Sequence, residues 1–119
     1  MRIDFNDKKE LFNKVAQHWA KEIKSKKTTS TQLRNYYDKV LELYEKSKYL
    51  NDEEFENEIL PFVKMLNSKV AYGVGRGVVT WKFQNMMKYC IAQVDNKKDL
   101  EVFKYFFEAV IGFYKGGEK

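Results

Sequence analysis

Two side chains in this sequence are of the types that nucleophilic and acid–base chemistry use. His18 is the only histidine and Cys90 the only cysteine, so neither a disulfide within the chain nor a metal site with two histidines can form. Cys90 has no histidine near it and falls with Met86, Met87 and Val94 at helical spacing. We therefore expect Cys90 to be a small buried hydrophobic residue. The sequence predicts no catalytic residue, no metal site and no cofactor.

His18 begins a short pattern, His18-Trp19-Ala20-Lys21. This pattern is similar to the H-x-x-K motif of histidine phosphotransfer domains, which are also helical bundles. Those domains have glycine at the next position, where this chain has Glu22. A phosphotransfer-like signalling domain that uses His18 remains an alternative, and we expect His18 to be a rim residue beside Trp19.

Three glycines and a run of acids are the other patterns that could carry chemistry. Gly73, Gly75 and Gly77 match neither the G-x-G-x-x-G fingerprint nor the G-K-[ST] of a P-loop, so they predict a helix end followed by a turn. Alternatively, glycines beside Arg76 could let a phosphodiester backbone approach closely. The acids of residues 52–58 lack the glycine-containing loop of a calcium site, which favours a solvated helix face.

The net charge of the chain is concentrated in residues 59–94. This segment has five basic residues and no acid, and the other 17 of the 22 Lys and Arg residues equal the 17 Asp and Glu residues in number. The net charge of +5 therefore belongs to this segment, whose basic residues are Lys64, Lys69, Arg76, Lys82 and Lys88. Such a surface attracts a polyanion. Because the bias spans two segments rather than one amphipathic helix, we favour nucleic acid over a membrane surface.

Lys69 and Arg76 are the best-motivated pair of basic residues. They are seven residues apart and share a helix face if the helix reaches Arg76, with Gly73 between them and no side chain there to obstruct a ligand. They could also be ordinary surface cations. Tyr72 and Trp81 could stack on bases, but aromatic residues at helical spacing are more often buried, so we expect them in the core.

Apolar residues recur at helical spacing along the whole chain, and no segment alternates as a strand does. We predict an all-α, compact bundle of about five helices, or six if Pro61 splits the third, in a single domain of residues 1–119. With no apolar leader and no long apolar run, we expect a cytoplasmic protein with no membrane contact. The expected helices cover residues 7–27, about 30–47, from Asn51 or Asp52 through Pro61 to about 74, 79–94, and 97 to about 115.

Three stretches in this sequence together resemble one known family. They are Leu60-Pro61-Phe62-Val63-Lys64-Met65-Leu66 with Lys69-Val70-Ala71-Tyr72 and Gly75-Arg76, then Ser30-Thr31-Gln32-Leu33-Arg34, and Phe106-Phe107-Glu108-Ala109-Val110 with Tyr114-Lys115-Gly116-Gly117. This combination is similar to the small-subunit family of type III-A CRISPR-Cas effector complexes, the Csm complexes. Gly112, where the family tends to have a small non-glycine residue, and the short C-terminus after Tyr114 depart from the pattern.

The resemblance implies a non-catalytic helical subunit, present in several copies, that contacts target RNA paired to guide RNA and adjoins other subunits of the complex. It nominates Arg34, Lys64, Lys69 and Arg76 for RNA-backbone contact, whereas charge alone nominates Lys82 and Lys88. The isolated chain could form a homodimer. A basic protein–protein adaptor is a further alternative.

Overall fold

The computed structural model of the chain describes residues 1–117, and these residues form helices and no strand. The predicted all-α class is confirmed. Glu118 and Lys119, which end the expected domain, lie outside the described residues. In chain order the elements are the π-helical turn η1 (Leu11–Val15), α1 (Ala16–Glu22), α2 (Ser30–Ser47), α3 (Asp52–Glu58), α4 (Leu60–Gly75), α5 (Trp81–Ala92) and α6 (Lys97–Gly116).

Side-chain caps start three of these helices where the sequence places them. The Thr29 hydroxyl accepts the Gln32 N–H at 3.2 Å and begins α2. Asn51 and Glu54 form a reciprocal capping box at the start of α3, and Asn96 caps α6. Each cap satisfies N–H groups that have no partner inside the helix, so these starting points are fixed by local chemistry.

Pro61 divides the third predicted helix into two, which makes the six-helix alternative the correct one. Helix α3 ends at Glu58, and α4 begins at Leu60 with Pro61 in its first turn. A proline is tolerated there because first-turn N–H groups have no acceptor inside the helix.

The first helix is shorter than the predicted span of residues 7–27. It begins with η1, in which the Val15 N–H reaches the Glu10 carbonyl at 3.1 Å across five residues. After this wide turn Ala16 is fully buried, whereas Val15 is only partly buried and Phe12 is exposed.

The N-terminal residues, which precede the first helix, pack on the bundle in a way that the periodicity does not predict. Ile3 and Phe5 are buried. Between them and α5 lies the Gln93 side chain, whose Oε1 accepts the Phe5 N–H and whose Nε2 donates to the Ile3 carbonyl, both at 2.8 Å. The Gln93 amide therefore satisfies the hydrogen-bonding capacity of these two backbone groups, which lie outside any helix.

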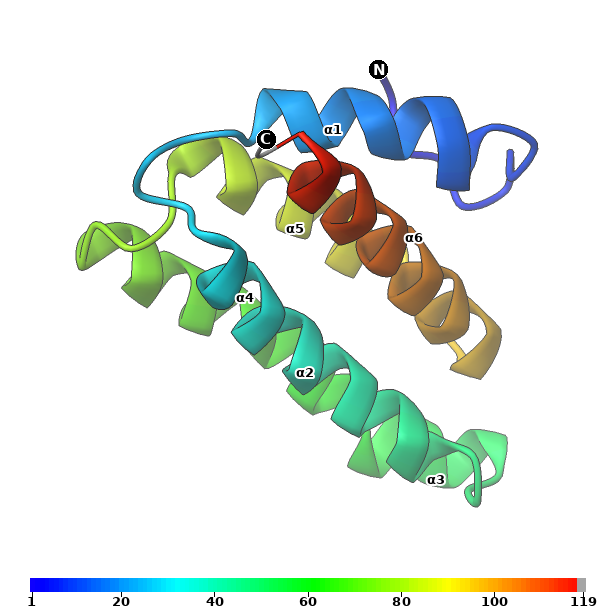
Figure 1. Cartoon of the computed structure of the whole chain (residues 1–119). Coiled ribbons are helices and arrows are strands. Elements are labelled where there is room, and N and C mark those ends of the chain that lie inside the picture. Colours follow the sequence, from blue (N-terminus) through cyan, green and yellow to red (C-terminus); the bar gives the residue numbers. More distant parts are fainter. Residues whose placement is uncertain (118–119) are drawn as a thin grey trace.

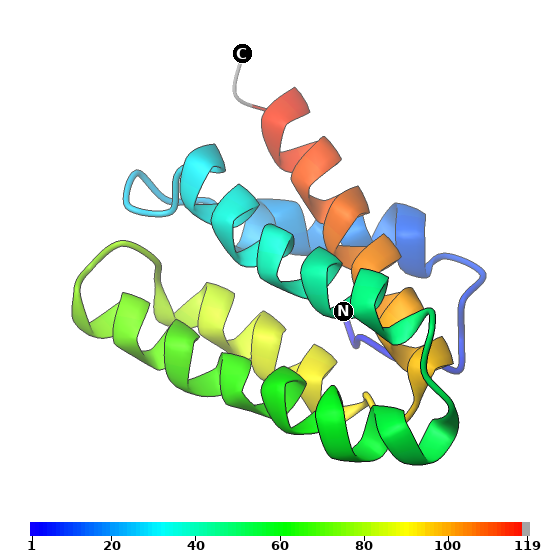
Figure 2. The ribbon, with the colours of Figure 1, turned by 90° about the horizontal axis from the view of Figure 1, so that it is seen from below.

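The helices pack around one apolar core, in which α2 is antiparallel to α4 and α6, α4 is antiparallel to α5, and α1 runs in roughly the same direction as α6 (Figure 1). Figure 1 shows α6 between α1 and α2, and Figure 2 shows α4 and α5 side by side below them. Phe83 of α5 meets Phe107 of α6 at the centre, with ring centroids 6.1 Å apart. The buried side chains form a single cluster. None of the described helices is long and apolar enough to cross a bilayer.

Candidate nucleic-acid interface

The basic segment of residues 59–94 forms a hairpin of two antiparallel helices, α4 and α5 (Figure 1). Residues 76–80 make the turn between them. Its first part is a Schellman motif, in which the Val78 N–H bonds to the Gly73 carbonyl and the Gly77 N–H to the Val74 carbonyl, both at 3.0 Å. Gly77 has a φ of 75°, which an L side chain rarely adopts. The predicted helix end and turn are confirmed.

Gly73 does not leave an open path between Lys69 and Arg76, and that part of the prediction is wrong. Gly73 is buried, and a Cβ there would overlap the Tyr36 hydroxyl of α2 and lie 3.1 Å from Val79. The missing side chain lets α2 approach α4 closely. The Tyr36 hydroxyl donates to the Lys69 carbonyl at 3.3 Å across this contact.

Lys69 and Arg76 themselves lie together on the exposed side of α4. Both side chains are exposed, and Arg76 is the C-terminal cap of the helix, so the two are two turns apart on one face. Burial raises the pKa of Tyr36, while the charge of nearby Arg76 opposes that rise. The structure thus places the Arg76 charge near Tyr36 and the Lys69 carbonyl against the Tyr36 hydroxyl, in the half of α4 that leads into the turn.

Two other candidate lysines are held by the protein itself. The Lys64 ammonium donates to the Ile91 carbonyl at 2.8 Å, where it satisfies the C-terminal end of α5. Lys82 lies 3.7 Å from the Glu22 carboxylate of α1. Their charges add to the local potential, but their donors are partly occupied.

Lys88 and Arg34 lie apart from the Lys69–Arg76 pair. Lys88 is exposed and shares the outward face of α5 with Trp81, seven residues earlier. Arg34 is exposed, pairs with Asp38 at 3.4 Å and lies over the Tyr37 ring. Arg34 therefore lies on the α6 side of α2, whereas Tyr36, which contacts Lys69, faces α4. The six candidate residues do not form one compact cluster, because Arg76 and Lys82 flank the turn while Lys64 lies near the other end of the hairpin.

Tyr72 and Trp81 are exposed, so their expected place in the core is wrong. Their exposed fractions are 68% and 61%. The Arg76 guanidinium stands over the Tyr72 ring at 5.6 Å and the Lys82 ammonium over the Trp81 ring at 5.8 Å. The sequence spacing of these residues could have predicted their exposure, because neither falls on the buried stripe of its helix. The buried stripes consist of Val63, Leu66, Val70 and Gly73 in α4 and of Phe83, Met86, Met87, Cys90 and Ile91 in α5.

The residues of the chemical types first considered are not arranged for catalysis. Cys90 is fully buried, as predicted, and burial raises the pKa of its thiol. His18 is a half-buried rim residue, edge-on to Trp19 at 5.8 Å, with Nε2 at 3.2 Å from the N-terminal amine. Within residues 1–117, no three His, Cys, Asp or Glu side chains gather as metal ligands would.

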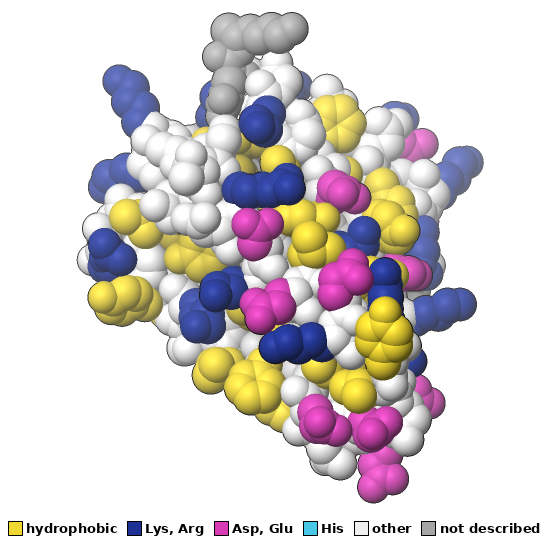
Figure 3. Space-filling model, turned by 60° about the horizontal axis from the view of Figure 1, so that its bottom comes forward, with side chains coloured by type: hydrophobic (Ala, Val, Ile, Leu, Met, Phe, Trp, Pro, Cys, Tyr) yellow, Lys and Arg dark blue, Asp and Glu magenta, His cyan; other side chains and the backbone are white. Residues whose placement is uncertain are grey.

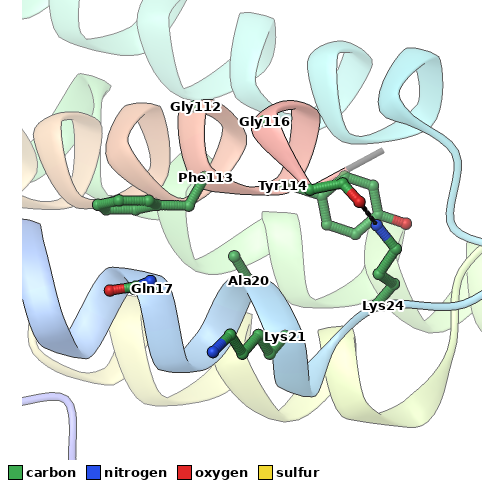
Figure 4. A pocket seen from close by; sticks show the side chains of 9 residues that line it. Gln17, Ala20, Lys21, Lys24, Gly112, Phe113, Tyr114 and Gly116 are labelled. Atoms are coloured by element: carbon green, nitrogen blue, oxygen red, sulfur yellow. Dashed lines mark hydrogen bonds between the residues drawn. The ribbon is translucent and has the colours of Figure 1, made fainter. Parts of the chain in front are cut away.

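A shallow pocket of about 450 Å³ lies between α1 and the end of α6. Figure 4 shows it lined by Gln17, Ala20, Lys21 and Lys24 on one side and by Gly112, Phe113, Tyr114 and Gly116 on the other. The Lys24 ammonium donates to the Gly117 carbonyl at 2.8 Å and stands over the Tyr114 ring. These contacts tie the two helix ends together, and the lining holds no acid–base pair.

Figure 3 shows how charge is distributed on the face that α3 and the hairpin help to form. Acidic side chains gather at the lower tip of this view, and Lys and Arg side chains stand beside exposed apolar ones toward its left edge. The tip matches α3, which carries Asp52, Glu53, Glu54, Glu56 and Glu58, and the left edge matches the turn between α4 and α5 (Figure 1).

Comparison with known proteins identifies the family to which this chain belongs. Searches of curated proteins and of solved structures return no significant match. A family model, Csm2 type III-A, matches residues 6–119, nearly the whole chain. Its span includes every element of the bundle and all six candidate cations. The chain therefore belongs to the Csm2 type III-A family and is a subunit of a type III-A CRISPR-Cas effector complex.

Proposed function

We propose that this chain is a non-catalytic small subunit that holds the backbone of the guide RNA and target RNA independently of sequence. The observation that carries the proposal is the α4–α5 hairpin, which has the whole net charge of +5 and presents Lys69 and Arg76 together at its exposed end. Lys and Arg side chains at such a surface bind phosphate oxygens, which carry no base information.

The remaining candidates extend this surface. Lys88 lies on the outward face of α5 and Arg34 beyond Tyr36 on α2, while Lys64 and Lys82 add charge near the ends of α5. Each contact is weak alone, so useful affinity requires several copies of the subunit along one RNA. Sequence is then read by pairing between guide and target rather than by the protein. Further copies of the chain and the other effector subunits are accordingly its proposed protein partners, in a cytoplasmic complex.

A salt titration of the isolated chain with unrelated single-stranded RNAs tests the proposal. If four to five cations each meet one phosphate, the plot of log affinity against log salt should have a slope of roughly −3, at about 0.7 per contact. The double variant Lys69→Glu/Arg76→Glu should weaken binding to every RNA alike and make the slope shallower by about 1.4.

The matched control is Lys9→Glu/Lys14→Glu, which changes the net charge equally at two exposed lysines in and before η1, outside the hairpin. It should retain nearly the original slope. Equal slopes for the two double variants, with helix content unchanged, would rule out the hairpin as the RNA-binding surface.

A further inference from the structure

Two large aromatic rings stand in solvent at the turn end of the basic hairpin. Tyr72, near the end of α4, is 68% exposed, and Trp81, the first residue of α5, is 61% exposed. By contrast, the other tryptophan of the chain, Trp19, is 8% exposed. Leaving rings of this size in water forgoes the burial that usually stabilises them, and an exposed Trp or Tyr is therefore a candidate binding group.

Each exposed ring is paired with a cation from its own helix end. Arg76 covers Tyr72 and Lys82 covers Trp81, with 5.6 Å and 5.8 Å from the cationic group to the ring centroid. A cation on one face holds the ring in place through its quadrupole and leaves the other face for a ligand. Arg76 and Lys82 are also among the proposed phosphate contacts, so ring and charge are presented together.

The charge around the rings indicates what they bind. Residues 59–94 contain no acid, and the described carboxylate that approaches either cation is that of Glu22, paired with Lys82. A polyanion with flat, stackable groups fits such a surface. Single-stranded RNA has this chemistry, because every base offers a π face and every link a phosphate.

We propose that Tyr72 and Trp81 are stacking platforms for unpaired nucleobases of the RNA whose phosphates Arg76 and Lys82 contact. The inference rests on the proposed function and adds that the nucleotides bound at these two rings are not base-paired. Stacking tolerates every base, so it is compatible with binding that is independent of sequence.

The chain offers a natural control in Tyr49, at the other end of the molecule. Tyr49 is more exposed than either ring, at 87%, but it lies among Glu45, Lys46 and Glu58 next to the acidic α3. The carboxylates around this ring disfavour a phosphate backbone there. Tyr49→Leu removes as much aromatic surface as Tyr72→Leu and should leave RNA binding unchanged.

The test uses the full chain and two oligomers of roughly 12 nucleotides, within the usual site size for single strands. One is a mixed-sequence RNA, and the other is the same ribose-phosphate chain without bases. Stacking is worth about 1–3 kcal/mol per base, so the wild type should bind the RNA at least about fivefold more tightly than the base-free chain. Trp81 emission should be quenched by the RNA and not by the base-free chain.

The variants separate stacking from charge. Tyr72→Leu/Trp81→Leu should lose the preference for bases and bind the base-free chain as the wild type does. Equal binding of both oligomers by the wild type, with the salt slope intact, would overturn stacking and leave the proposed function standing. Failure to bind either oligomer would overturn both. Loss of a partner subunit instead of RNA in the Leu variants would assign the rings to a protein contact and also overturn the inference.

Discussion

Gly73 sets the distance between α2 and α4, and through it the position of the basic pair. The Tyr36 hydroxyl occupies the space that a Cβ at residue 73 would need and bonds to the Lys69 carbonyl. Gly75, one half-turn later, has nothing within 4 Å of its corresponding position. Packing against α2 therefore requires a glycine at position 73, whereas no neighbouring atom requires one at position 75.

Alanine at these two glycines should have opposite effects on the free energy of unfolding. Gly73→Ala should destabilise the protein by about 1–3 kcal/mol, because the methyl group forces Tyr36 away. Gly75→Ala should be neutral or stabilising by up to about 1 kcal/mol, because alanine favours the helical backbone. Urea unfolding followed by circular dichroism measures both.

The Tyr36→Phe/Gly73→Ala double variant serves as the check. Removing the hydroxyl should recover part of the Gly73→Ala loss, so the two changes should not add. Strict additivity would mean that the Tyr36 hydroxyl does not limit the approach of the helices.

For single residues, the sequence predicts burial along a helix better than it predicts which neighbours surround a residue. The burial of Cys90 follows from its helical spacing with Met86, Met87 and Val94, and it is confirmed. The open path at Gly73 is a wrong prediction, because periodicity indicates which face a residue occupies but not which helix covers that face, and only the packing of α2 on α4 shows that Gly73 is covered. The core position expected for Tyr72 and Trp81 is wrong although their spacing already sets them off the buried stripes.

Among the elements, α2 is bound to both of its neighbours by tyrosine hydroxyls. Tyr37 donates to Glu108 at 3.2 Å and Tyr44 donates to Glu101 at 2.9 Å, both on α6. Tyr36 bonds to α4. The hydrogen bond to Glu101, together with burial, raises the pKa of Tyr44 to about 12. These bonds require the protonated phenol, so the contact between α2 and α6 depends on pH.

The stability of the protein should therefore fall as the pH rises above 10. The folded pKa of Tyr44 is above its ordinary value of 10, so its contribution is complete below pH 10 and is lost as the pH approaches 12. Tyr44→Phe should show a smaller fall, while Tyr49→Phe, at an exposed tyrosine, should behave as the wild type. Urea unfolding between pH 8 and about pH 11 tests this; parallel curves for all three proteins would contradict it.

Helix positions were largely predictable because capping residues and Pro61 act locally. Starts at Thr29, Asn51 and Asn96 follow from single side chains. The N-terminal part of the chain was not predictable to the same degree, since the packing of residues 1–6 depends on tertiary contacts such as the hydrogen bonds of the Gln93 side chain to Ile3 and Phe5. The local sequence pattern therefore predicts where the helices lie along the chain, while packing determines which faces of the helices are covered.

For the molecule as a whole, one continuous core supports the proposal that residues 1–119 fold as a single domain. The buried residues of all helices belong to one cluster. We expect one cooperative unfolding transition, with Trp19 fluorescence and helical circular dichroism following the same curve, because Trp19 packs in that core. Chelators should leave the midpoint unchanged. Two separated transitions would indicate two independent units.

Acidic residues gather in α3, and the net positive charge belongs to the α4–α5 hairpin. The central claim is that this hairpin holds RNA within a type III-A effector complex. The most direct measurement purifies the complex through a tagged copy of this chain and titrates target RNA at about 50 and 200 mM salt, where phosphate contacts differ most. Complexes carrying Lys69→Glu/Arg76→Glu should retain the same subunits and guide RNA, bind target more weakly, and lose less affinity between the two salts than wild type. Unchanged target affinity and salt dependence in an intact variant complex would contradict the account.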